Sequence, residues 1–220
     1  RATSIGTEAS AYTAYSRRMY YGTTNGEIYY YRAGSRFRNV FARNVIEPVS
    51  DISVGFQSLV LAGRERMFRF SSDILSRPRE EPRYVRSRNA DKPTEEPVLL
   101  EATGSRNVLL WQRDRPTGTV WNYDPIFGES EVLVEEETPV RHVHAYDDGY
   151  LILSGAGSFR DLAADSLETR FSYTSLGMEK VFRSEEYGIL VAKSKTDDFS
   201  SALLRIDPET GETVPIRTSE

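Results

Sequence analysis

Cysteine is absent from this 220-residue sequence, which excludes disulfides and thiolate ligands for a metal ion. Only two histidines are present. No apolar run approaches the ~18 residues of a membrane-spanning helix, so we expect no membrane span. The glycine patterns of nucleophile elbows, phosphate-binding loops and dinucleotide-binding folds are also missing. These absences point away from the common enzyme classes, and we expect neither a cofactor nor a metal ion.

Lysine is scarce as well, since it supplies only four of the 28 basic residues, and the net charge is −5. An acidic chain of this kind is not expected to bind nucleic acid. The sequence begins at Arg1 with neither an initiator methionine nor a signal-peptide pattern. We therefore expect a chain that is processed or excised from something longer.

Tyrosine, by contrast, is abundant, and five of the thirteen tyrosines surround one Asn-Gly pair in the stretch MYYGTTNGEIYYYRAG. Asn25-Gly26 predicts a type I′ turn, because both central residues of that turn need positive φ. The aromatic runs on either side predict the two strands of a β-hairpin. Alternation along a strand puts Tyr29 and Tyr31 on one face and Tyr30 on the other. We interpret the cluster as packing between layers, with a ligand-stacking surface as the alternative.

Two internal repeats organise the rest of the chain. DPIFGES (124–130) and DPETGET (207–213) share the pattern Asp-Pro-x-x-Gly-Glu-Ser/Thr. PVSDISVGFQSLVLAG (48–63) and PVRHVHAYDDGYLILSG (139–155) share a Pro-Val start and an apolar run that ends in glycine. The second strands of the repeated units are expected around Tyr21, Val60, Leu110, Ile152 and Leu190. Their mean spacing of about 42 residues lies within the ~40–50 residues of a propeller blade.

The stretch PVRHVHAYDDGYLILSG resembles the first two strands of a WD-repeat blade, and the likeness is best over 48–70 and 139–155. No unit carries the Gly-His start or the Trp-Asp end of such repeats. SALLRIDPETGETVPI (201–216) looks more like the strand-turn-strand of irregular bacterial propellers. The resemblance implies an all-β fold: an irregular, WD-repeat-like β-propeller of five four-stranded antiparallel blades, or five blades of a larger propeller.

We expect a single domain over 1–220. Its approximate units are 1–44, 45–97, 98–137, 138–176 and 177–220. In the fourth unit, strands are expected at 139–146, 150–154, 158–163 and 168–173.

Two stretches fit this scheme less well. Residues 76–97 carry four prolines and many charges, and they predict a long exposed loop around one strand at 83–87. Residues 158–170 are compatible with a short amphipathic helix as well as with strand and turn.

The two histidines, His142 and His144, form a His-x-His pair. On a strand this spacing puts both imidazoles on one face, as in some zinc sites, and Asp147 or Asp148 could supply a carboxylate. A third ligand at a known spacing is missing. We therefore interpret the pair as strand packing or as lining of a central channel, and we predict no metal site.

Several charged side chains stand near the starts of the predicted innermost strands, which line the central channel of a propeller. The candidates for lining this channel are Glu8, Asp51, Glu101, His142 and Glu179. A ring of carboxylates there resembles the layout of five-bladed glycosidases, which need a pair of acids to cleave a glycosidic bond. A carbohydrate-active propeller, either a glycosidase or a lectin, is therefore the alternative function.

Basic side chains gather in the loops that join second to third strands and consecutive blades, which emerge on one face of a propeller. These side chains are Arg64, Arg113, Arg115, Arg141, Lys193 and Lys195. Against a negative net charge they predict a local site for an acidic partner, held by arginine–carboxylate pairs. Charged loops are usually just solvated surface, and this is the simpler interpretation of these residues. We thus predict a non-catalytic protein-interaction or structural scaffold, with a protein partner or as a subunit of a larger assembly.

Overall fold

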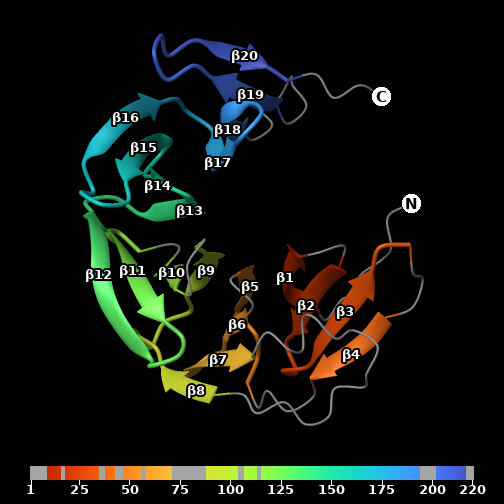
Figure 1. Ribbon diagram of the computed structural model, residues 1–220. Helices are drawn as coiled ribbons and strands as arrows, with labels where there is room; N and C mark the ends of the chain where they lie inside the picture. The colour runs from red at the N-terminus through yellow and green to blue at the C-terminus, as the bar shows by residue number, and fades with distance from the viewer. Residues whose placement is uncertain are drawn as a thin grey trace. The chain divides into compact units, whose positions relative to one another are not determined.

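The computed structural model describes residues 9–15, 18–34, 38–42, 47–55, 58–70, 88–103, 107–112, 115–193 and 202–216. Within these residues the strands form five antiparallel sheets of four strands each (Figure 1). In every sheet, strands that follow one another in the chain are also neighbours in the sheet. The all-β fold of four-stranded antiparallel units that the sequence predicts is therefore confirmed. No helix long and apolar enough to cross a membrane occurs in these residues.

We number the sheets as blades 1 to 5. Blade 1 contains β1 (Ala9–Tyr15), β2 (Arg18–Thr23), β3 (Ile28–Arg32) and β4 (Arg38–Ala42). Blade 2 contains β5 (Asp51–Gly55), β6 (Ser58–Ala62), β7 (Arg66–Phe70) and β8 (Arg88–Asp91). Blade 3 contains β9 (Leu99–Ala102), β10 (Val108–Trp111), β11 (Gly118–Asp124) and β12 (Glu129–Glu136). Blade 4 contains β13 (Val140–Tyr146), β14 (Gly149–Ser154), β15 (Ser158–Ala163) and β16 (Thr169–Thr174). Blade 5 contains β17 (Met178–Ser184), β18 (Gly188–Lys193), β19 (Ala202–Ile206) and β20 (Thr213–Pro215).

The chain forms two compact units. Unit 1 consists of Arg1–Gln112 and Trp121–Leu133, and unit 2 consists of Arg113–Val120 and Val134–Glu220. Within unit 1, the first strand β5 lies beside the first strands β1 and β9, and within unit 2 β13 lies beside β17. Neighbouring first strands are what a radial arrangement of blades requires, because the first strand of each blade is the innermost.

The second strands β6, β10 and β14 are buried on both faces, which explains their continuous apolar sequences, whereas in β18 only the alternate residues Ile189 and Val191 are fully buried. In β6, Leu59 packs into a cluster with Tyr20 and Phe41 of blade 1, whereas its neighbour Val60 packs into a cluster with Leu100 of blade 3. All five predicted second-strand positions lie in second strands, namely β2, β6, β10, β14 and β18. The repeat reading of the sequence is confirmed at these positions.

The repeated Asp-Pro-x-x-Gly pattern closes the same turn in two blades. Asp124 and Asp207 each accept a hydrogen bond at 2.8 Å, through Oδ1, from the backbone N–H two residues later. Gly128 and Gly211 each donate their N–H to the carbonyl of that aspartate, also at 2.8 Å. Both glycines have positive φ, 75° and 72°, a conformation that other residues adopt only with strain. The pattern therefore marks the hairpins β11–β12 and β19–β20.

The turn between β2 and β3 differs from the predicted type I′ turn. Gly26 has a φ of 77°, but Asn25 keeps a negative φ. Thr23 organises a wider loop, because its carbonyl accepts the N–H of Gly26 at 3.1 Å and its hydroxyl accepts the N–H of Glu27 at 3.0 Å. The hairpin itself is as predicted, but the turn type is wrong, since a side-chain contact of Thr23 decides it.

The tyrosine cluster divides between the two faces of blade 1 as the alternation predicts. On the face toward blade 2, Tyr30 packs on Tyr20 with 5.9 Å between ring centroids. On the opposite face, Tyr21 stacks on Tyr29 and Tyr31 at 5.4 and 5.7 Å. Tyr20 is 1% and Tyr29 7% exposed. The interpretation as packing between layers is therefore confirmed for Tyr20 and Tyr30, which pack against blade 2, whereas Tyr21, Tyr29 and Tyr31 stack on one another within blade 1.

The two stretches that fitted the blade scheme less well have different outcomes. Residues 158–170 form β15 and the start of β16, so they are strand and turn, and the helical alternative is wrong. The strand expected at 83–87 lies outside the described residues, and the fourth strand of blade 2 in the described part is β8.

Candidate functional site

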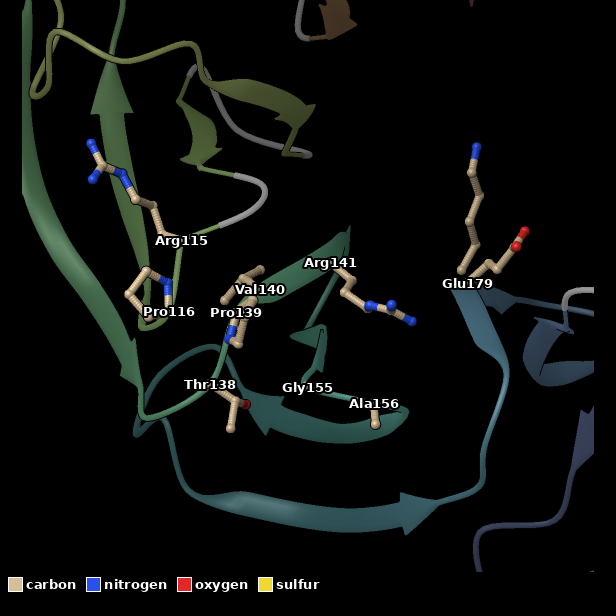
Figure 2. Close-up of a pocket in the computed structure, with 10 residues that line it drawn as sticks. Arg115, Pro116, Thr138, Pro139, Val140, Arg141, Gly155, Ala156 and Glu179 are labelled. Carbon is tan, nitrogen blue, oxygen red and sulfur yellow. The ribbon is translucent and has the colours of Figure 1, made fainter.

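Unit 2 contains a pocket of about 880 Å³ (Figure 2). It lies where β13 and β17 begin, beside the turn that precedes β11 and the turn between β14 and β15. Its charged lining residues are Arg115, Arg141, Glu179 and Lys180. Its apolar lining residues are Pro116, Pro139, Val140 and Ala156. We call this cavity the unit-2 pocket.

Two β-bulges supply charged side chains to the unit-2 pocket. Arg141 is the extra residue of a bulge in β13, and Glu179 is the extra residue of the corresponding bulge in β17. A bulge turns a side chain away from the direction that regular alternation would give it. Arg141 points from β13 toward the start of β17, where Glu179 lies, and both side chains are exposed (Figure 2).

The wall of the pocket depends on close backbone contacts. A Cβ atom on Gly118 would lie 2.4 Å from Cγ2 of the buried Val140, so only glycine lets the start of β11 approach this strand. The Gly155 N–H donates to the carbonyl of Pro139 at 2.9 Å, which ties the β14–β15 turn to the start of β13. Arg115 and Pro116 therefore lie on one side of Val140, and Arg141 and Glu179 on the other (Figure 2).

The lining of the unit-2 pocket is positively charged on balance. Among its described lining residues three are cations, Arg115, Arg141 and Lys180, and one, Glu179, is an anion. Arg141 Nη1 donates to the carbonyl of Met178 at 3.4 Å, which directs its guanidinium toward β17. The chain as a whole has a net charge of −5, so this pocket reverses the general trend. Such a lining is suited to carboxylates and other anions, which arginine binds in a planar, two-pronged geometry.

The structure brings two of the six predicted basic residues, Arg115 and Arg141, into this one pocket. Arg141 lies within β13, the strand expected at 139–146, and Lys193 ends β18, so neither residue lies in a loop as their grouping with the loop residues assumed. Lys193 Nζ donates to the hydroxyl of Ser175. Lys180 was missed, since nothing in its sequence context distinguishes it from a solvated surface lysine.

The remaining predicted basic residues do not contribute to the unit-2 pocket. Arg64 lies in unit 1 with an exposed side chain, and its carbonyl accepts a hydrogen bond from Lys92. Burial lowers the pKa of the Lys92 ammonium group. Arg113 and Lys195 lie outside the described residues.

Two of the predicted channel residues link neighbouring blades. Asp51 accepts the N–H of its neighbour Ile52 at 2.8 Å through Oδ1 and the N–H of Leu100 in blade 3 at 2.7 Å through Oδ2. His142 Nδ1 accepts the N–H of Val181 in blade 5 at 3.5 Å. Asp51 and His142 each precede a buried residue of a first strand, so they occupy matching positions in blades 2 and 4. Both side chains therefore serve the contact between blades.

The other channel candidates have separate positions. Glu101 is half-buried on β9 in unit 1, Glu179 lines the unit-2 pocket, and Glu8 lies outside the described residues. His142 and His144 both pack edge-on against Phe182, at 5.3 and 5.9 Å between ring centroids, in agreement with strand packing. In the described part of the chain no three potential ligands from histidine, aspartate and glutamate gather as a metal site.

A second polar contact joins blades 4 and 5. The hydroxyl of Tyr146 donates to the buried Asp161, whose other carboxylate oxygen lies 4.0 Å from Arg183 of β17. Arg183 also lies over the Tyr146 ring, 5.3 Å from its centroid. Burial and the hydrogen bond to Asp161 raise the pKa of Tyr146 above its usual range. Tyr146, Asp161 and Arg183 thus contact one another, and these contacts hold β17 against blade 4.

Comparison with known proteins identifies the fold. No protein-family model and no curated protein matches this sequence. By structure, the chain is similar to the WD40 domain of Pan2 from Neurospora crassa, with a TM-score of 0.60 and 11% identity over 94% of this chain and 65% of that chain. It is similar to a chain of a nidogen/laminin complex, with a TM-score of 0.64 and 11% identity over 92% of this chain and 76% of that chain.

A third similar structure is a chain of a mitotic checkpoint complex, with a TM-score of 0.60 and 12% identity over 91% of this chain. The present chain spans 60% of that chain's length and 65% of the Pan2 chain's length. These likenesses confirm the predicted β-propeller fold of five four-stranded blades and its resemblance to WD-repeat propellers. At this level of identity they establish the fold alone.

Proposed function

We propose that this chain is a protein-interaction scaffold and that its unit-2 pocket binds an acidic segment of a protein partner. The observation that carries the proposal is the meeting of Arg115, Arg141 and Lys180 around one cavity in an acidic chain. Arginine pairs with carboxylates through two parallel hydrogen bonds, so the pocket offers affinity and orientation together. The side chains of Arg115, Arg141 and Lys180 are exposed. Pairing them with a carboxylate therefore has a lower desolvation cost than pairing deeply buried charges.

The fold supports an interaction role in a general way. Two of the similar propellers were solved as chains of protein complexes, the nidogen/laminin complex and the mitotic checkpoint complex. A propeller offers a rigid base whose loops can carry a binding surface, and the site on it, not the fold, decides the function. The same argument covers a role as a subunit of a larger assembly.

No observation favours the carbohydrate-active alternative over the scaffold. Both carboxylate oxygens of Asp51 already accept backbone N–H groups, which gives that residue a structural role. Glu179 is the one carboxylate among the described lining residues of the pocket, whereas cleavage of a glycosidic bond needs a pair of acids.

The proposal is tested by site-specific photo-crosslinking. A benzoylphenylalanine at position 156, in the pocket lining, is compared with one at position 165, in the exposed turn after β15. We expect a protein to crosslink at position 156 but not at 165, and the double change Arg115→Glu and Arg141→Glu to abolish the crosslink. An equal yield with the double change, or crosslinks at position 165 alone, would show that the pocket is not the binding site.

A further inference from the structure

Leu176 stands at a position that is polar in the other connections between blades. Four connections in the described part lead into a buried residue at or just before the start of a first strand, and each such residue is at most 1% exposed. These connections are Glu47-Pro48-Val49, Glu96-Pro97-Val98, Thr138-Pro139-Val140 and Leu176-Gly177-Met178. Leu176 therefore corresponds to Glu47, Glu96 and Thr138.

The fold does not need an apolar side chain at this position. Glu47 shows what the position does in blade 2, where its Oε2 accepts the N–H of Glu65 at 2.7 Å and so caps the β6–β7 turn. Leu176 is 80% exposed, so its side chain contributes little to the core of unit 2. Single exposed apolar residues are common on protein surfaces. Leu176 differs from the others in its place in the connection that leads into β17, where the matching connections carry glutamate or threonine.

The turn that carries Leu176 is held firmly beside the unit-2 pocket. The N–H of Ser175 donates to the carbonyl of Gly157 at 2.8 Å, and the Ser175 hydroxyl accepts a hydrogen bond from Lys193. Gly157 ends the β14–β15 turn, whose Ala156 lines the pocket. Leu176 thus lies beside the pocket rim on a fixed turn, with the ammonium group of Lys193 next to it.

We infer that the partner segment recognised by this face is both acidic and apolar: a large apolar side chain packs on Leu176 while a nearby carboxylate pairs with Arg141 or Arg115. This inference rests on the proposed function and adds the composition of the partner to it. In such a contact the apolar surface that Leu176 and the partner bury would supply affinity, and the charged groups beside it would select the partner. The excess of cations in the pocket fits a segment of negative charge.

The repeats supply variants that should fold normally. Leu176→Thr copies Thr138 of the preceding connection, and Leu176→Glu copies Glu47 and Glu96. Val214→Thr on β20 is the matched control, because Val214 is also a highly exposed apolar residue of unit 2, at 58%. All three variants remove exposed apolar surface, and only the first two remove it beside the pocket.

The test selects random displayed dodecapeptides on the full chain and measures the recovered peptides against each variant by fluorescence anisotropy. We expect recovered peptides to combine Asp or Glu with a large apolar residue. Leu176→Thr should weaken their binding about tenfold, Leu176→Glu should weaken it further, and Val214→Thr should leave it unchanged.

Peptides that bind Leu176→Thr as tightly as the wild-type chain, or a selection without acidic and apolar residues together, would overturn the inference. The double change Arg115→Glu and Arg141→Glu separates the two proposals. If it abolishes binding while Leu176→Thr has no effect, the pocket stands as the site and only the apolar anchor is wrong. If neither change has an effect, the proposed function is wrong as well.

Discussion

The carboxylate of Asp51 accepts a hydrogen bond from the backbone N–H of Leu100 at 2.7 Å, although the two residues belong to different sheets. First strands of neighbouring blades do not pair through their backbones, so a side chain supplies the acceptor that a strand would supply inside a sheet. His142 does the same for the N–H of Val181 between blades 4 and 5. The same position in the blade therefore supplies the acceptor for the next blade in both cases, as an aspartate in blade 2 and as a histidine in blade 4.

Asp51→Ala should destabilise the chain by about 1–3 kcal/mol, because it leaves the N–H of the buried Leu100 without this acceptor. Asp51→Asn keeps an acceptor oxygen and should cost less. The free energy of unfolding in urea measures both, with Glu95→Ala as an exposed control. Equal stability of Asp51→Ala and the wild-type chain would show that this contact contributes nothing to the joint between blades.

Tyr29→Ala should lower the stability by about 3 kcal/mol or more, as expected for a large buried aromatic residue, since it removes a ring that is 7% exposed and stacked on Tyr21. Tyr12 is 67% exposed, and its replacement by alanine should change the stability by less than about 0.5 kcal/mol. Thermal and urea unfolding of the two variants provide the comparison. A similar small effect of both changes would mean that the tyrosines of blade 1 are surface residues.

Tyr123→Phe should leave the chain as stable as before, or stabilise it by about 1 kcal/mol, because the buried Tyr123 hydroxyl has no hydrogen-bond partner among the described residues. The stability gained by Tyr123→Phe relative to the wild-type chain should increase with pH. Burial, with smaller contributions from Asp124 and Asp91, raises the pKa of Tyr123 to about 12, above its ordinary value near 10.

Between these two pKa values the unfolded chain has lost the Tyr123 proton and the folded chain has kept it, so stability falls as pH rises. Relative to the wild-type chain, Tyr123→Phe should therefore gain about 1.4 kcal/mol between pH 8 and pH 11. Urea unfolding at the two pH values measures this difference. A difference that does not change with pH would contradict the raised pKa of this tyrosine.

The fold was largely predictable because the apolar runs, the turn residues and the repeat spacing of the sequence all agree with it. Buried second strands such as the one around Ile152 need a continuous apolar run, and the Asp-Pro-x-x-Gly turns need glycine at Gly128 and Gly211. The turn after Thr23 was not predictable from Asn25-Gly26 alone, because the hydroxyl of Thr23 competes for the backbone of the loop.

The candidate site was predictable only in part. The count of basic residues near blade connections indicated Arg115 and Arg141, but it gave no reason to separate them from the other four. The bulges at Arg141 and Glu179 are single-residue shifts of register that depend on the partner strand, so the alternation along β13 or β17 does not show them. For the same reason the pocket lining could not be assembled from sequence.

The central claim, that the unit-2 pocket recognises an acidic partner, is tested most directly by the association rate of the partner captured by crosslinking, measured against ionic strength. The double change Arg115→Glu and Arg141→Glu should slow association by about tenfold or more at low salt and flatten its salt dependence, because steering by these cations is lost. The control, Arg66→Glu and Arg205→Glu, alters the net charge equally at exposed positions away from the pocket lining and should retain most of the rate and its salt dependence. If the pocket variant associates as fast as the control, with the same salt dependence, the account of this site is wrong.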